Sequence, residues 1–377
     1  MRILLVGDYP RDARLGSTKV ALKLQEELQV LGHTCDVLLA DDLGSFPRNR
    51  FARQALAPLA ALAAVGRAVR TNGRYDVIDV ASAEGLWLGA LRRLGMLSAA
   101  VVARSNGLEQ LNYQRMLEDH DAGISQKPWT RRVWYPAVRL SQVAAAARWA
   151  DRMILLNAAD REYAVSRGWK PESRIDLVPH GVSSRFLADV PPAGSPRGRG
   201  ILFCGTWDAM KGIHYLTAAY ATLIARGRRV PLTVLGGGVP ADTILSAFPA
   251  PARACVRVVD RVLEEDVIDA YRSHDLLVLP SSYEGFGMVV LEAMSQRLPV
   301  IATPVGCATF LVDHEETGLI VPTRDAIALA DAIDRLLDDP GLRTRLAESA
   351  RARVEGMTWT RTAPLTLDAY ARARARS

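Results

Sequence analysis

Residues 276–294 read Leu-Leu-Val-Leu-Pro-Ser-Ser-Tyr-Glu-Gly-Phe-Gly-Met-Val-Val-Leu-Glu-Ala-Met, and this stretch decides the fold. The apolar run 276–279 predicts a buried parallel strand, and Gly285 and Gly287 let the chain turn sharply into a helix that begins near Met288. The first turn of a helix has free backbone N–H groups and carries the positive end of the helix dipole. The turn after this strand is therefore suited to bind an anion.

Two glutamates, Glu284 and Glu292, are eight positions apart in the same stretch. At a helical rise of about 1.5 Å per residue the separation is roughly 12 Å, which is about the reach of a sugar, a diphosphate and a ribose laid end to end. One carboxylate could then bind sugar hydroxyls while the other binds ribose hydroxyls. The alternative is a chance spacing of two solvated glutamates, but the strand and the glycine turn in front of them favour a ligand site.

Length and composition set the broad class of the protein. A chain of 377 residues is too long for one ordinary core, so we expect two domains of roughly 150 to 200 residues. The net charge of +6 favours anionic partners such as a nucleotide diphosphate, an anionic membrane or nucleic acid. The four cysteines form no C-x-x-C pair, and no apolar stretch is long enough for a spanning helix. We therefore expect a cytoplasmic protein, either free or peripheral to the inner face of the membrane.

Strands alternate with helical patterns along the chain, and the alternation begins again after the Pro-, Gly- and Arg-rich stretch 191–200. This pattern is typical of parallel sheets with helices on both faces. We therefore predict an α/β protein with two Rossmann-like domains joined near residues 185–200. Ligands of such domains bind at the carboxyl ends of the strands, where Glu284 lies. The predicted strands are 3–6, 35–39, 77–80, 99–102, 153–156, 201–203, 232–235, 256–259, 276–279, 300–302 and 319–321.

The stretch 281–294 closely resembles the glutamate-bounded donor motif of the retaining nucleotide-sugar glycosyltransferases of family 4, the group 1 type, which have the GT-B fold. The resemblance covers essentially the whole chain. It implies an acceptor-side domain (1–185) facing a donor domain (186–359) across a cleft, and a final helix (360–377) that returns to the first domain. It assigns the transferred sugar to Glu284 and the ribose to Glu292. The positions that it places near sugar and phosphate are Gly285, Phe286, Gly287, Met288 and Val289.

The loop 205–212 follows a predicted strand and places a lysine at a strand-to-helix turn, although a loop lysine is by itself usually only solvated. The loop aligns without gaps on the second phosphate-binding loop of the resembled family. That match assigns Gly205, Thr206 and Lys211 to the donor diphosphate, with Thr206 in place of the family's arginine. A charge-assisted hydrogen bond is worth about 1.5 to 3 kcal/mol. We therefore expect slow turnover, or binding without catalysis, unless another cation such as Arg14 replaces the arginine.

Two positions of the first domain also match the family. Gly16, between the first strand and its helix, permits close approach of the donor, although an ordinary turn with Ser17 or Thr18 as helix cap explains it equally well. Asn106 stands where many members have a histidine near the reacting sugar and the acceptor. Asparagine can hydrogen-bond a hydroxyl but cannot shuttle a proton at neutral pH. Because retaining members are described as using the leaving phosphate as the base, the substitution leaves that mechanism open.

The remaining polar residues give weaker indications. His180 replaces the asparagine of a Pro-Asn-Gly-Val turn in the family, and a lone histidine in a turn is more often structural than catalytic. No histidine has metal-ligand spacing and no Asp-x-Asp motif follows a strand, so we predict no metal and no cofactor apart from the donor substrate. Arginines lie among apolar residues in the segments 48–70 and 129–139. These segments would suit a membrane surface with lipid-linked acceptors, but packing on the sheet is the favoured explanation.

We therefore predict a metal-independent retaining glycosyltransferase that moves a sugar from a nucleotide-diphosphate sugar to a hydroxyl of a glycan, a lipid-linked sugar or a small molecule. The catalytic candidates are Glu284, Lys211 and Asn106. The first alternative, favoured by Thr206 and Asn106, is a nucleotide-sugar-binding protein that has lost transfer activity. A nucleotide-sugar epimerase is a weaker alternative, because no motif is specific to it. We expect no nucleic-acid partner, because the basic residues lack an aromatic-rich signature.

Overall fold

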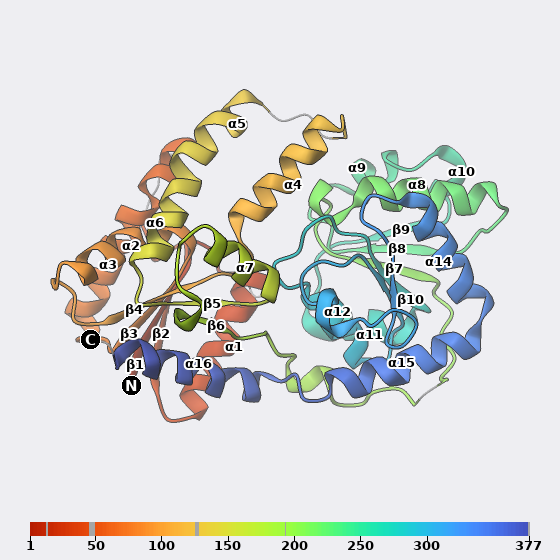
Figure 1. Cartoon of the computed structure of the whole chain (residues 1–377). Coiled ribbons are helices and arrows are strands. Elements are labelled where there is room, and N and C mark those ends of the chain that lie inside the picture. The colour runs from red at the N-terminus through yellow and green to blue at the C-terminus, as the bar shows by residue number, and fades with distance from the viewer. Residues whose placement is uncertain (13, 45–49, 125–127, 193, 376–377) are drawn as a thin grey trace. The chain divides into compact units, whose positions relative to one another are not determined.

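The computed structural model describes residues 1–12, 14–44, 50–124, 128–192 and 194–375, and the chain divides into two compact units (Figure 1). Unit 1 comprises Met1–Gly181 and Trp359–Ser377, and unit 2 comprises Val182–Thr358. The two boundaries predicted from the sequence, after residues 185 and 359, lie slightly C-terminal to these points. Both units are α/β structures built on a parallel sheet.

Unit 1 contains a six-stranded parallel sheet in the order β2-β1-β3-β4-β5-β6. Five of its strands were predicted to within one or two residues, and the short edge strand β6 was missed. The strands are β1 (Arg2–Val6), β2 (Thr34–Leu38), β3 (Val77–Ala81), β4 (Ala100–Arg104), β5 (Arg152–Leu155) and β6 (Ile175–Leu177). The helices are α1 (Gly16–Val30), α2 (Arg50–Asn72), α3 (Leu86–Arg93), α4 (Glu109–Asp121), α5 (Trp129–Tyr135), α6 (Ser141–Trp149), α7 (Ala158–Ser166) and α16 (Trp359–Arg374).

The central strand β1 shows why this sheet is covered on both faces. Successive side chains of a strand point to opposite faces. Ile3 and Leu5 pack in one buried cluster with residues of α1 and α16. Leu4 and Val6 pack in a second cluster with residues of α2. A continuous apolar run therefore serves both cores, as is usual for a parallel sheet.

Helix α16 closes the fold of unit 1, although it follows unit 2 in the sequence. Trp359 and Tyr370 of this helix are buried in the same cluster as β1. The Tyr370 hydroxyl donates a hydrogen bond of 2.5 Å to Asp79 Oδ2 in β3, and the guanidinium of Arg104 in β4 lies 2.7 Å from the same oxygen. The predicted return of the final helix to the first domain is thus confirmed.

Unit 2 contains the second six-stranded parallel sheet, in the order β12-β11-β10-β7-β8-β9. All six of its strands were predicted. They are β7 (Ile201–Cys204), β8 (Leu232–Leu235), β9 (Val256–Val259), β10 (Leu276–Leu279), β11 (Val300–Ala302) and β12 (Leu319–Ile320). The helices are α8 (Ile213–Ala225), α9 (Ala241–Ser246), α10 (Ala250–Arg253), α11 (Glu264–Ser273), α12 (Met288–Ser295), α13 (Ala308–Leu311), α14 (Ala326–Asp338) and α15 (Pro340–Val354).

Ser17 and Thr18 do not cap α1, because the helix already begins at Gly16 and both residues lie inside its first turn. The Thr18 hydroxyl instead donates to the carbonyl of Pro10.

Within the described residues, no helix is both long enough and apolar enough to cross a bilayer. Arg48, one of the arginines of the segment 48–70, lies outside those residues.

Candidate functional site

In unit 2, the loops that follow β7 and β10 bring a lysine and a glutamate into direct contact. Lys211 Nζ donates to both carboxylate oxygens of Glu284, each at 2.7 Å. Ser281 Oγ donates to Oε1 of the same carboxylate, also at 2.7 Å. Glu284 is buried, whereas the Lys211 side chain keeps 19% of its surface exposed. The structure thus brings together two of the three predicted catalytic residues at the carboxyl ends of adjacent strands.

A glycine at the start of α8 makes this contact possible. Gly212 has φ +72°, and a Cβ at this position would lie 1.9 Å from the carbonyl oxygen of Pro280. Any other residue would therefore push the two loops apart. The backbone N–H of Ser282 donates to the carbonyl of Met210 at 2.9 Å, which fixes the loops to each other.

The strand-to-helix turn after β10 has the predicted form. Gly287 is the N-cap of α12 with φ +88°, and the helix begins at Met288. No acidic residue lies in the first turn of α12, so its positive end is not neutralised from within that turn. Glu284 precedes the helix, however, and the predicted separation of about 12 Å from Glu292 assumed helical rise throughout. Helical rise therefore holds only from Met288 onward, so the estimate of about 12 Å does not describe the whole separation of Glu284 and Glu292.

Glu292 lies on α12 and is mostly buried, with 5% of its surface exposed. The hydroxyl of Tyr271, on α11, donates to Glu292 Oε2 at 3.0 Å. Burial, together with the neighbouring Cys204 and Glu292, raises the pKa of Tyr271 well above its ordinary value, so this phenol keeps its proton. Tyr271 was not predicted as a site residue, and it orients one oxygen of the carboxylate assigned to ribose.

The family arginine that Thr206 replaces has no evident substitute among the residues that we proposed. Thr206 is exposed at the end of β7. Arg14, the proposed replacement, forms a double hydrogen bond with Asp12 through Nε and Nη2, both at 2.9 Å. Its charge is therefore already balanced by a carboxylate. At Gly16 an added Cβ would meet nothing within 4 Å, so the start of α1 is open to approach.

Unit 1 has its own polar pocket, a cavity of about 230 Å³ at the carboxyl ends of β1, β3 and β4. Asn106 lines it and donates through Nδ2 to the hydroxyl of Tyr9 at 3.1 Å. The Asn106 Oδ1 atom is buried and has no hydrogen-bond partner among the described residues. Exchanging the amide oxygen and nitrogen would only leave the nitrogen there instead. One polar atom of Asn106 therefore has no hydrogen-bond partner among the described residues in either orientation, and it is shielded from solvent in this structure.

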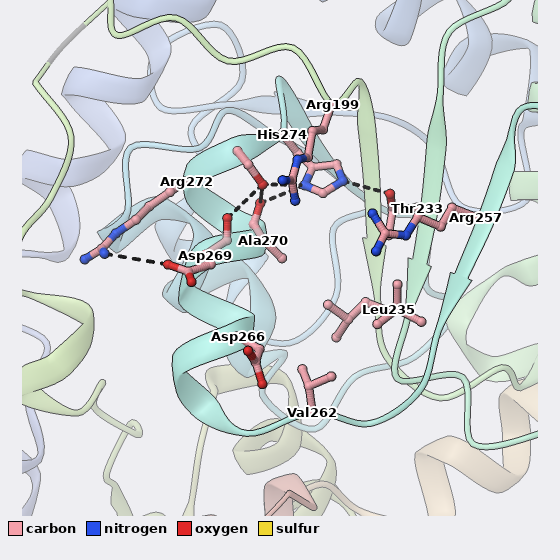
Figure 2. A pocket seen from close by; sticks show the side chains of 12 residues that line it. Arg199, Thr233, Leu235, Arg257, Val262, Asp266, Asp269, Ala270, Arg272 and His274 are labelled. Atoms are coloured by element: carbon pink, nitrogen blue, oxygen red, sulfur yellow. Dashed lines mark hydrogen bonds and ion pairs between the residues drawn. The ribbon is translucent and has the colours of Figure 1, made fainter.

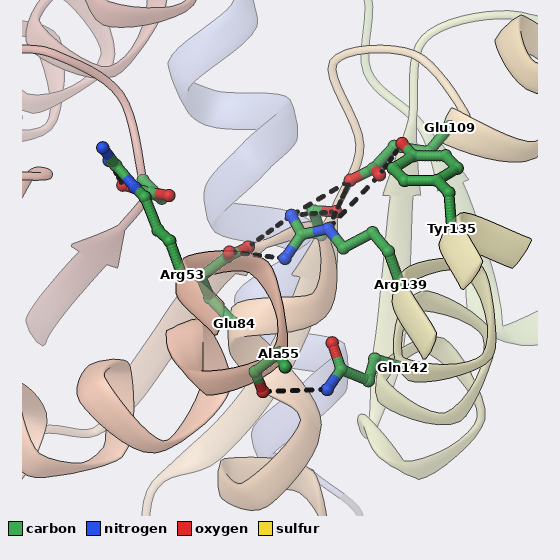
Figure 3. Close-up of polar contacts among 9 residues, drawn as sticks. Arg53, Ala55, Glu84, Glu109, Tyr135, Arg139 and Gln142 are labelled. Carbon is green, nitrogen blue, oxygen red and sulfur yellow. Dashed lines mark hydrogen bonds and ion pairs between the residues drawn. The ribbon is translucent and has the colours of Figure 1, made fainter. Parts of the chain in front are cut away.

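An arginine between two glutamates forms one wall of this pocket (Figure 3). Arg139 Nη1 donates to Glu84 Oε1 at 2.9 Å, and Nη2 donates to Glu109 Oε1 at 3.1 Å. Ser82 and Tyr135 donate to Glu109, the latter at 2.6 Å. The side chains of Arg139 and Glu84 are 11% and 1% exposed, so the pair is nearly removed from water.

The charges in this network stabilise one another. Burial raises the pKa of Glu84, and Arg139 opposes that shift. Burial also disfavours ionisation of Glu109, but Arg139 and the hydrogen bonds outweigh it, so the pKa of Glu109 is lowered. Burial acts to lower the pKa of Arg139, yet the two carboxylates raise it above its ordinary value. Arg139 thus stays protonated and is shared between two acidic groups.

The local backbone around the network is unusual at two places. Pro136–Leu140, which contains Arg139, is a π-helical turn between α5 and α6. Pro136 has no N–H to donate, which favours such a break, and π turns are frequent at functional sites. Ser82 has φ +54°, a conformation that costs roughly 1 to 3 kcal/mol in a residue other than glycine. Both distortions position side chains of this pocket.

His180 has the structural character that we favoured. It is buried in unit 1, and its ring lies 5.5 Å from that of Trp359 in α16. Burial, and secondly the charge of Arg104, lowers the pKa of His180 to about 3. The imidazole is therefore neutral at physiological pH.

A second hollow, of about 620 Å³, is lined by residues of β8, β9 and α11 of unit 2 (Figure 2). Its lining includes the charged residues Arg257 and Asp266. His274 and Thr233 also line it, and they are hydrogen-bonded to each other at 2.8 Å. None of the residues predicted for a site lines it. Among the described residues, moreover, no group of three or more His, Cys, Asp or Glu could hold a metal ion.

Sequence reasoning missed Ser281 and Tyr271 in unit 2, and it missed Tyr9, Glu84 and Glu109 as site residues in unit 1. Glu84 follows β3 and Glu109 follows β4, so the rule that ligands bind at the carboxyl ends of strands would have found them. Tyr271 carries no comparable signal, because it lies inside a helix.

Known structures define the fold class. Sucrose-phosphate synthase from Thermosynechococcus elongatus is similar with a TM-score of 0.79 and 24% identity, and the match covers 100% of both chains. Anabaena HepE in complex with UDP and glucose is similar with a TM-score of 0.70 and 18% identity over 98% of this chain and 99% of that one. The chain thus has the two-domain GT-B fold.

Sequence comparison shows the family. The description "Glycosyltransferase Family 4" fits residues 16–186, and "Glycosyl transferases group 1" fits residues 195–353. The chain belongs to the family 4, group 1 glycosyltransferases, which confirms the family predicted from the sequence.

Curated relatives are similar over a smaller part of their length. D-inositol 3-phosphate glycosyltransferase from Kineococcus radiotolerans is 31% identical over 63% of this chain and 61% of its own length. Alpha-D-kanosaminyltransferase from Streptomyces kanamyceticus is 30% identical over 60% of this chain and 62% of its own length. The chain thus spans about three fifths of the curated relatives that it matches.

Proposed function

We propose that this chain transfers a glycosyl group from a nucleotide-diphosphate sugar to an acceptor hydroxyl and retains the anomeric configuration. The observation that carries the proposal is the contact of Lys211, Glu284 and Ser281 at the carboxyl ends of β7 and β10. Such strand ends are where ligands of Rossmann-like domains bind. The donor is held in unit 2, with its diphosphate at Lys211 and the first turn of α12.

Each proposed donor contact follows from the charge of the group. The Lys211 ammonium has three donors and can bridge a phosphate oxygen while it keeps a bond to Glu284. Glu284 accepts hydrogen bonds from hydroxyls of the transferred sugar, and Glu292 accepts them from ribose. Backbone N–H groups around Gly287 and Met288 bind phosphate oxygens at the helix N-terminus.

The transfer step itself breaks one bond and forms another at the same carbon. The bond from the anomeric carbon to the phosphate oxygen breaks, and the acceptor oxygen bonds to that carbon on the same face. The acceptor proton moves to the departing phosphate oxygen, so the step requires no protein base. This fits Asn106, which cannot accept a proton at neutral pH but can orient the hydroxyl. Fixed charges and positioning supply the rate.

The test is to incubate the chain with UDP-, GDP- and ADP-linked sugars and measure released nucleoside diphosphate, with and without sugar and polyol acceptors. We expect release with one donor class, stimulated by an acceptor, and a glycoside whose anomeric configuration matches that of the donor. Glu284→Gln should lower the rate about 10²- to 10³-fold, because a preorganised polar contact is lost. Glu316→Gln, an exposed glutamate of the same unit, is the matched control and should leave the rate unchanged.

Other outcomes identify the alternatives. Donor binding that raises the thermal midpoint without any nucleotide release would show a binding protein that lacks transfer activity. Conversion of the donor sugar without an acceptor would indicate an epimerase. An inverted product, or equal rates for Glu284→Gln and the wild type, would contradict the proposal.

A further inference from the structure

The pocket of unit 1 has an excess of negative charge. Among the described side chains that line it, Asp8, Glu84 and Glu109 are acidic, whereas Arg104 and Arg139 are basic, which leaves a formal charge of −1. The neighbours just outside the pocket do not alter this balance. Arg53 pairs with Asp8 at 2.7 Å, and Asp79 pairs with Arg104, so these two added charges cancel. If Glu84 keeps a proton the total is zero, and in neither state is it positive.

The basic groups of this pocket are already bound within the chain. Arg139 makes hydrogen bonds to both glutamates through Nε, Nη1 and Nη2. Arg104 binds Asp79 in the core, where a charge without its partner would be costly. A ligand phosphate would have to displace a carboxylate from Arg139, either that of the fully buried Glu84 or that of Glu109, which would keep its bonds from Ser82 and Tyr135. Both arginines that line the pocket are therefore paired with carboxylates of the chain, although Arg104 Nη2 makes no hydrogen bond to the described residues beyond its ion pair with Asp79.

The helix end at this pocket is also occupied by a carboxylate of the chain. Glu109 lies in the first turn of α4, where the dipole favours a negative charge. The backbone N–H of Gly107 is bound to Ser105 Oγ at 3.1 Å. The positive end of α4 is thus matched by a resident side chain. What remains for a ligand is neutral hydrogen bonding at Asn106 and acceptor oxygens on Glu109.

We propose that the pocket of Asn106, Glu84, Glu109 and Arg139 selects a polyhydroxylated acceptor that carries no anionic group, either uncharged or aminated. This inference rests on the proposed transfer activity and adds the chemical class of its acceptor. The Asn106 amide binds one acceptor hydroxyl, and Glu109, the more exposed of the two glutamates, receives a hydroxyl or ammonium group. A phosphate is disfavoured, because the pocket has no net positive charge and its arginines already hold carboxylates.

The inference separates this chain from several of its relatives. Proteins that are similar to it are named for D-inositol 3-phosphate, which carries a phosphate, and the chain covers only about three fifths of their length. Similarity alone would suggest a phosphorylated acceptor. The charge balance of the pocket predicts the opposite preference.

Binding of matched probes tests the proposal without the need for turnover. Scyllo-inosamine, myo-inositol and D-inositol 3-phosphate share a cyclitol ring and differ in charge, as do glucosamine, glucose and glucose 6-phosphate. Saturation-transfer NMR or calorimetry on the whole chain should give tighter binding of the amine and the neutral probe in at least one series, by about tenfold or more over the phosphate. Asn106→Ala should weaken both favoured probes.

The role of the Glu109 charge is tested with Glu109→Gln, which keeps hydrogen-bonding capacity but removes the negative charge and frees part of Arg139. In this variant the ratio of the affinity for the neutral or amine probe to the affinity for the phosphate probe should fall at least tenfold. The dissociation constant of the nucleotide-sugar donor should not change. Glu118→Gln, an exposed glutamate on the same helix, is the control.

If Glu109→Gln fails to fold, the order of probe affinities measured on the wild-type chain still decides. Tighter binding of the phosphorylated probe to the wild type, or no binding of any probe, overturns the inference. Failure of donor turnover alone would instead overturn the proposed transfer.

Discussion

The two units each hold a carboxylate against a cation at the ends of their strands, but in different proportions. In unit 2, one lysine faces one glutamate, and the lysine side chain remains partly exposed. In unit 1, Arg139 is enclosed between Glu84 and Glu109, and the pocket has a surplus of acid. A partly exposed cation can bind a further anion, whereas an arginine held by two carboxylates cannot do so without cost. This difference supports our proposals that the donor diphosphate binds in unit 2 and that a non-anionic acceptor binds in unit 1.

The largest expected effect is that of removing the cation of unit 2. Lys211→Met should lower the transfer rate about 10²- to 10³-fold, because a preorganised charge at the leaving diphosphate is lost. The rate of nucleotide release under donor saturation measures it. Lys23→Met, on the surface of α1, should leave the rate unchanged. A Lys211→Met enzyme as fast as the wild type would remove the distinction between the units.

Adding a cation to unit 2 should have the next largest effect. Thr206→Arg restores the family arginine, and a charge-assisted hydrogen bond of about 1.5 to 3 kcal/mol corresponds to roughly a ten- to hundredfold gain in kcat/KM. Thr206→Gln adds length without charge and should give little gain. Equal rates for both variants would show that the missing arginine does not limit this chain.

A smaller change in kinetics is expected when the Asn106 amide of unit 1, which can hydrogen-bond the acceptor, is removed. Asn106→Ala should raise KM for the acceptor about two- to tenfold, since one hydrogen bond contributes about 0.5 to 1.5 kcal/mol. The dissociation constant of the donor, measured by calorimetry, should not change. A loss of donor affinity in this variant would contradict the assignment of Asn106 to the acceptor side.

The last prediction compares the buried histidines of the two units. His274 of unit 2 is hydrogen-bonded to Thr233 and Ala270, and its pKa is lowered mainly by burial. His180 of unit 1 has a pKa of about 3, below the unfolded value, so its contribution is complete above about pH 6.5 and is lost as pH falls toward 3.

His180→Asn should therefore reduce the slope of unfolding free energy against pH between 6 and 4 by up to about 1.4 kcal/mol per pH unit. Denaturant titrations at several pH values measure this slope. Identical slopes for the variant and the wild type would show that His180 is not held neutral by the fold.

The donor side was predictable because its signals are local. The strand β10, the glycine turn and Glu284 lie within the twelve residues 276–287, and all six strands of unit 2 follow from short apolar runs. In unit 1, the positions of Glu84 and Glu109 after β3 and β4 could have been predicted, but their shared contact with Arg139 could not. Glu84, Glu109 and Arg139 come from separate elements, and their contacts depend on the packing of α6 against the segment Ser82–Gly85 rather than on spacing.

The most direct test of the account is hydrogen–deuterium exchange of the whole chain with and without its nucleotide-sugar donor. Bound donor should slow exchange in the segments 205–213 and 281–292 of unit 2, while residues 82–109 of unit 1 should respond only when a neutral acceptor is added. Donor protection confined to residues 82–109, with no change around Lys211 and Glu284, would contradict the assignment of the donor to unit 2.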